Sequence, residues 1–90
     1  MPRYLIEREF PDGLHIPQNE AGQAVCRKVG ENNAEVGVTW VHSYVTPDRK
    51  HTFCVYDGPN PEAIRRAAQS NKLPITKITE VRVLDPYFYA

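Results

Sequence analysis

The period of the hydrophobic pattern switches repeatedly along this 90-residue chain, and the order of the switches restricts the fold more than any other feature. Residues 4–10 form an alternating, β-rich run that the turn residues at 11–13 end. Between residues 19 and 33, apolar and small side chains recur at spacings of three and four, which predicts a helix. Two further β-rich runs, 38–45 and 51–56, flank the turn sequence TPDR and predict a hairpin.

The rest of the chain adds a helix and a final strand. The sequence NPE at positions 60–62 is a typical helix start, with an N-cap asparagine, a proline in the first turn and an acid near the positive end of the helix dipole. We therefore predict a helix over residues 61–70 and a last strand over residues 78–84. The order β-α-β-β-α-β predicts a single α+β domain over residues 1–90 with the ferredoxin-like fold, an antiparallel sheet with two helices on one face.

The hairpin carries large apolar side chains on both of its predicted faces. Trp40 and Tyr44 alternate with Val41 and Val45, so neither face is suited to open contact with water. Because two helices can cover one face only, we expect a second copy of the chain to cover the other, in a homodimer packed sheet to sheet. The aromatic tail at residues 85–90 is expected to reach across to that partner.

The charge balance excludes some classes of partner. Eleven basic residues balance eleven acidic ones, which leaves no positive field to hold a nucleic acid. No run approaches the ~18 apolar residues of a membrane span, and the charged residues at 7–9 interrupt the first segment before a secretory leader could form. We therefore expect a cytoplasmic protein that binds neither nucleic acid nor membrane, with Cys26 and Cys54 reduced.

His42 is the first candidate functional residue, because the alternation places it on one strand face with Trp40 and Tyr44. A four-residue turn would set His42 opposite Phe53, whereas a turn one residue longer would set it opposite Cys54. In the second register an imidazole and a thiol become cross-strand neighbours that could bind a soft divalent metal. The alternative is an ordinary half-buried histidine within an aromatic face.

The positions of the other candidate residues in the sequence give weaker evidence of a functional role. His51 lies beside the hairpin turn and His15 lies in the loop after the first strand, so both could equally be solvated side chains without a role. Cys26 falls within the predicted helical stripe, where a free thiol behaves as a small core residue. The sequence contains no HExxH, CxxC, nucleophile-elbow or glycine-rich phosphate motif. The residues alone therefore assign no catalytic group and give only a weak metal signal.

Four stretches of sequence carry a resemblance to a known family. They are MPRYLIERxFP at the start, GVTWVHSYV and KxxFCVYDGPxPEAIRxxA in the middle, and ITxITEVRVLDPYFY at the end. Over nearly its whole length the chain resembles a small bacterial family of ferredoxin-like proteins, formerly classed as a domain of unknown function and described as nickel-binding. The resemblance implies a homodimer that binds nickel at its surface, with a suggested role in nickel sequestration or tolerance. It implies no enzymatic activity and no further protein partner.

Nickel(II) binds imidazole well, with carboxylate, thiolate or water completing its shell. The candidate metal ligands are therefore His42, His51 and His15, with Cys54 as a weaker candidate because its neighbours predict burial. Three histidines cannot form a closed octahedral shell, so we expect sites that are open, shared between subunits or completed by water and acids.

A second hypothesis comes from another class of protein. The chain could be a small-molecule-binding protein or an enzyme of the dimeric α/β-barrel type, with its pocket near Trp40, His42 and Tyr44. A deep cavity beside His42 would favour this hypothesis, whereas shallow, exposed histidines would favour metal binding.

Overall fold

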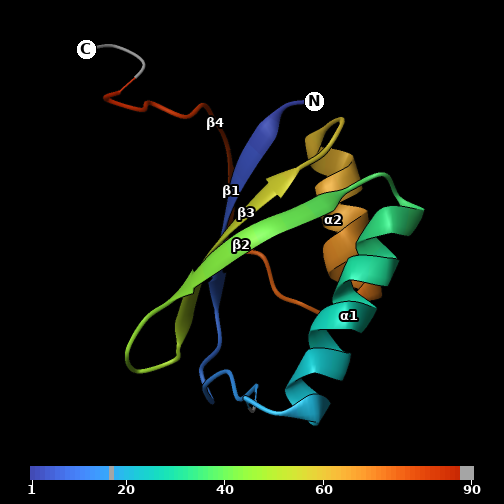
Figure 1. The fold of residues 1–90 in the computed structure, drawn as a ribbon, viewed down its shortest axis with the longest axis vertical. Helices are drawn as coiled ribbons and strands as arrows, with labels where there is room; N and C mark the ends of the chain where they lie inside the picture. The colour runs from blue at the N-terminus through green and yellow to red at the C-terminus, as the bar shows by residue number, and fades with distance from the viewer. Residues whose placement is uncertain (17, 88–90) are drawn as a thin grey trace.

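A computed structural model describes residues 1–16 and 18–87 of the chain. The elements follow the order β1 (Arg3–Glu9), α1 (Glu20–Glu35), β2 (Thr39–Val45), β3 (His51–Asp57), α2 (Pro61–Ser70) and β4 (Lys77–Val81). The strands form one antiparallel sheet in the order β2-β3-β1-β4, and both helices lie on the same face of it (Figure 1). The predicted ferredoxin-like α+β fold is therefore confirmed.

The last strand is shorter than its sequence pattern predicts. The prediction ran over residues 78–84, whereas β4 covers Lys77–Val81. Val81 pairs with Arg3, the first residue of β1, so the ladder between β1 and β4 ends at Val81. After this point the chain leaves the sheet (Figure 1), and Val83 and Leu84 are largely exposed. The expectation that the aromatic tail reaches a partner falls partly on residues 88–90, which lie outside the described residues.

Asparagine side chains begin both helices. Asn19 accepts hydrogen bonds from two N–H groups in the first turn of α1, and Asn60 accepts one from the N–H of Ala63 at 2.9 Å. Pro61 occupies the first turn of α2, where its missing N–H costs nothing. The predicted bounds of α2 are confirmed residue for residue, because this start signal is entirely local. In the described chain, neither helix has the length and apolar character needed to cross a membrane.

Both helices end in the Schellman arrangement, in which a left-handed residue lets the chain fold back on the last carbonyls. After α1, Gly37 has a φ of +71°, and the N–H of Val38 donates to the carbonyl of Asn33 at 2.9 Å. After α2, Lys72 has a φ of +56°, and the following N–H donates to the carbonyl of Ala68 at 2.9 Å. These turns direct the chain from each helix back towards the sheet.

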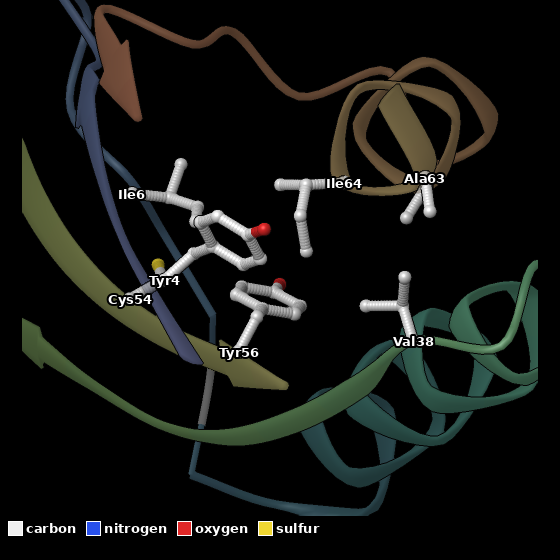
Figure 2. Close-up of a cluster of buried hydrophobic side chains, with 8 residues drawn as sticks. Tyr4, Ile6, Val38, Cys54, Tyr56, Ala63 and Ile64 are labelled. Carbon is white, nitrogen blue, oxygen red and sulfur yellow. The ribbon is translucent and has the colours of Figure 1, made fainter. Parts of the chain in front are cut away.

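The hydrophobic core lies between the sheet and α2. Tyr4 and Ile6 of β1 and Tyr56 of β3 point towards Ile64 of α2 (Figure 2), and these four side chains are at most 3% exposed. Four residues of α2 are buried: Ala63, Ile64, Ala67 and Ala68. The buried residues of α1 are a glycine and an asparagine, Gly22 and Asn33. The two helices therefore cover the same face of the sheet but fill the space beneath them unequally.

Candidate metal centre

A bulge in β2 decides where the aromatic and histidine side chains of this strand lie. Trp40 pairs with Tyr56, but the next paired residue is His42, opposite Val55, so Val41 is an extra residue in β2. The bulge shifts the alternation by one position. Trp40 therefore packs against the core on the helix side.

The face of the sheet that carries no helix is called the open face below. His42 and Tyr44 lie on it, because their partners in β3 alternate with the buried residues of that strand. The expectation that Trp40, His42 and Tyr44 share a face was wrong, because sequence alternation alone does not reveal a bulge. A single pocket lined by all three side chains is excluded for the same reason.

Neither of the two predicted hairpin registers is the observed one. Val45 pairs with Thr52 across a connection of residues 46–51, which sets His42 opposite Val55 rather than opposite Phe53 or Cys54. Cys54 faces the helices, is 6% exposed and has its Sγ 3.6 Å from the hydroxyl of Thr52. Because the imidazole of His42 lies on the other side of the sheet, the proposed cross-strand pair with Cys54 is ruled out within one chain.

His42 is an exposed residue with an aromatic neighbour. Its ring makes an edge-to-face contact with Tyr44, with ring centroids 5.2 Å apart. Its cross-strand partner Val55 offers no ligand atom. Val55 therefore supplies no ligand to a metal bound at His42, and the shell would have to be completed by water or by other groups.

His51 begins β3 on the open face and has an acidic partner. Its Cα partner in β1 is Glu9, and both residues are exposed. Directly opposed residues of an antiparallel pair have Cα atoms about 4.5–5.5 Å apart and side chains on the same face. An imidazole and a carboxylate at this spacing can both reach one metal ion, and both are ligand types that nickel(II) accepts. We therefore add Glu9 to the candidate ligands. The sequence did not indicate it, because its pairing with His51 depends on the contact between β1 and β3, which no local signal predicts.

The acidic side chain nearest in sequence to His51 is that of Asp48 in the hairpin turn. Hydrogen bonds from the Thr46 hydroxyl and the Lys50 N–H, and to a smaller extent the charges of His51 and Lys50, hold the pKa of Asp48 below its usual value. Asp48 therefore stays ionised at neutral pH and adds negative charge at this end of the sheet.

His15 lies apart from the other two histidines. Its ring packs over Gly13, whose φ is +84°, and a Cβ added to this glycine would lie 3.1 Å from the Nε2 atom of His15. The side chain also lines a cavity on the helix side of the sheet, whereas His42 and His51 are on the open face. His15 therefore cannot share a metal ion with them in one chain.

One chain offers a pair of ligands rather than a full shell. His42 lies opposite Val55, which is four residues, or about 13 Å, from His51 along β3. In the part of the chain that the structure describes, no three His, Cys, Asp or Glu side chains are grouped closely enough to hold a metal ion. A complete site on the open face would need water or a second chain.

The element order, the strand order and the uncovered sheet face define a ferredoxin-like domain with exposed histidines on its open side. The model of the family described as "Nickel responsive protein SCO4226-like" matches residues 4–81, and the chain belongs to this family. The crystal structure of SCO4226 from Streptomyces coelicolor A3(2) is similar to this structure, with a TM-score of 0.71 and 16% sequence identity, over 92% of this chain and 99% of that one. No curated protein matches the sequence.

Proposed function

We propose that this protein binds nickel(II) as a homodimer, on the open face of its sheet. Membership of a nickel-responsive family supports a nickel-related role. The observation that carries the proposal is the pairing of His51 with Glu9 on an exposed sheet surface, which gives an imidazole and a carboxylate within reach of one ion. A small protein with an open, water-completed site of this kind suits nickel sequestration or tolerance better than catalysis.

The composition of the open face supports a homodimer in which a second copy of the chain covers this face. Leu5, Phe53 and Val55 lie side by side at its centre and are only half-buried in a single chain, and Tyr44 beside them is 63% exposed. An apolar patch of this kind is stabilised when a second sheet covers it. His51 and Glu9 lie on the same face at the end of the strands and would form part of the rim of the interface.

A two-fold dimer could complete the metal shell. His42 and His51 of one chain are too far apart to share an ion, but in an isologous sheet-to-sheet dimer each residue of one copy faces the surface of the other. We propose that His51 and Glu9 of one copy and His42 of the second bind the same ion, with water in the remaining positions.

Calorimetric titration of nickel into variants tests these ligands. His51→Ala and His42→Ala are each expected to weaken binding by roughly tenfold or more, and Glu9→Gln by several-fold, because each removes one ligand atom. His15→Ala is the matched control and is expected to bind like the wild type, since His15 lies on the other side of the sheet. Binding that is equal in all five proteins, or that is lost only in His15→Ala, would refute the ligand assignment.

Mixing two variants tests whether the site is shared between chains. In a heterodimer of His42→Ala and His51→Ala chains, one of the two sites retains both histidines. An equimolar mixture should therefore recover tight binding at about a quarter of the wild-type stoichiometry, although neither variant binds tightly alone. A mixture that stays as weak as its components would contradict the shared site.

A further inference from the structure

A cavity of about 300 Å³ lies between the sheet and α1, on the side away from the proposed nickel site. It exists because the buried residues of α1 are Gly22 and Asn33, which leave the space beneath this helix less filled than the space beneath α2. Its lining is mainly apolar and includes Val25 and Val29 of α1, Trp40 of β2, Cys54 and Tyr56 of β3, and Arg8 of β1.

Arg8 places a buried positive charge in the wall of this cavity. The residue is 4% exposed, and its guanidinium donates from Nη1 to the carbonyl of Pro74 at 2.8 Å and lies 5.8 Å from the centroid of the Tyr56 ring. This bond uses one of the five N–H donors of the guanidinium. Within residues 1–16 and 18–87 no carboxylate pairs with it. The adjacent acids Glu7 and Glu9 alternate with Arg8 and therefore lie on the open face.

The neighbouring side chains do not neutralise this charge. Burial raises the pKa of the Tyr56 phenol above its usual value, although the Arg8 cation opposes the shift, so the phenol is uncharged at neutral pH. Thr52 and Ser43 also line the cavity and are neutral. A buried cation without a counter-charge is costly, and a site that contains one is suited to an anion.

We propose that the cavity binds a small molecule with an apolar body and one carboxylate group, and that the carboxylate pairs with Arg8. The planar guanidinium can bind a carboxylate through two parallel hydrogen bonds. The apolar body would fill the space lined by Val25, Val29 and Trp40, and the cavity volume lies at the lower end of the range for small-ligand pockets. The site is independent of the proposed nickel site, from which the sheet separates it.

The fluorescence of a tryptophan in the cavity wall can be used to measure this binding. Trp40 is the only tryptophan in the sequence and lines the cavity, with its indole N–H donating to the hydroxyl of Ser43 at 2.8 Å. We would titrate the protein with 3-phenylpropionate and with octanoate, each beside its neutral amide, and follow Trp40 fluorescence. At least one acid is expected to bind roughly tenfold or more tightly than its amide, because the amide keeps the shape but loses the charge.

Two variants test separately how the charge of Arg8 and the free volume of the cavity contribute to binding. Arg8→Gln is expected to remove the difference between acid and amide, whereas Val29→Phe fills the space and should weaken both by roughly tenfold. Arg65→Gln, an exposed change on α2, is the matched control and should leave both affinities unchanged. Circular dichroism checks that each variant is folded; if Arg8→Gln is not, the acid and amide comparison in the wild type decides.

Three results would overturn the proposal. They are the absence of binding by all four compounds at millimolar concentration, equal affinities for acid and amide in the wild type, and unchanged binding in a folded Val29→Phe variant. Nickel titration of the same proteins is a separate measurement, so failure of this proposal leaves the nickel proposal untouched.

Discussion

The side chains of Ile64 and Val25 differ in burial although both helices cover the same face of the sheet. Ile64 is 1% exposed and Val25 is 47% exposed. We expect Ile64→Ala to lower the free energy of unfolding by about 2–5 kcal/mol, and Val25→Ala to lower it by less than about 0.5 kcal/mol. Urea unfolding followed by circular dichroism measures both. Equal losses would contradict a core concentrated beneath α2.

A single ion pair gives stability that depends on pH. The Nε atom of Arg3 lies 2.7 Å from Oδ1 of Asp57, and this hydrogen bond holds the pKa of the Asp57 carboxyl below its usual value. The folded protein therefore binds this proton less readily than the unfolded chain, so the stabilisation is present above the ordinary aspartate pKa and is lost as the pH falls through the folded value.

The variant Asp57→Asn tests this linkage. At neutral pH it should be slightly less stable than the wild type, because the pair is partly exposed and water screens its charges. The two urea midpoints should converge as the pH drops below the pKa of the folded carboxyl. A difference that stays constant down to that pH would show that the side-chain charge is not the cause.

The sequence could indicate single candidate residues but not their partners. Arg8 is in phase with Tyr4 and Ile6 in the first alternating run, which is a signal that its side chain faces the core. Glu9 could be recognised only from the β1 to β3 register, and the side of the sheet on which Trp40 lies only from the bulge. Both depend on pairings between strands, which the local pattern does not encode.

Among the elements, the two glycines near the end of α1 should respond in opposite directions to the same substitution. Gly37 has a φ of +71° in the turn that ends the helix, whereas a Cβ at Gly30 would meet no atom within 4 Å. Gly37→Ala should therefore destabilise the protein by about 1 kcal/mol, and Gly30→Ala should stabilise it by about 0.5–1 kcal/mol. Thermal unfolding of both variants checks the pair. Two shifts of the same sign would contradict the assigned helix end.

Element types and order could be predicted because their signals are local. The helix over residues 61–70 is marked by its asparagine, proline and acid, and the strands by alternation and turn residues. The end of the last strand could not be predicted, since β4 stops where its partner β1 begins, and residues 82–84 continue the apolar pattern beyond that point.

For the whole molecule, the proposed dimer predicts a specific effect of charge at the centre of the open face. Phe53 is half-buried there, between Tyr44 of β2 and Glu7 of β1. Phe53→Glu should leave the single chain folded but prevent a second sheet from covering it, because an unpaired carboxylate would be buried. Sedimentation equilibrium should find a dimer for the wild type and for the helix-side control Arg65→Glu, and a monomer for Phe53→Glu. A wild type that stays monomeric at high concentration would contradict the dimer.

Anomalous diffraction at the nickel absorption edge, from crystals grown with nickel, would locate any bound nickel ion and identify its ligands. We expect a nickel ion bound by an imidazole nitrogen of His51 and a carboxylate oxygen of Glu9, between two copies packed by their open faces, with His42 of the second copy in the shell. Nickel found only at His15, or an open face that carries no metal and no second chain, would contradict it.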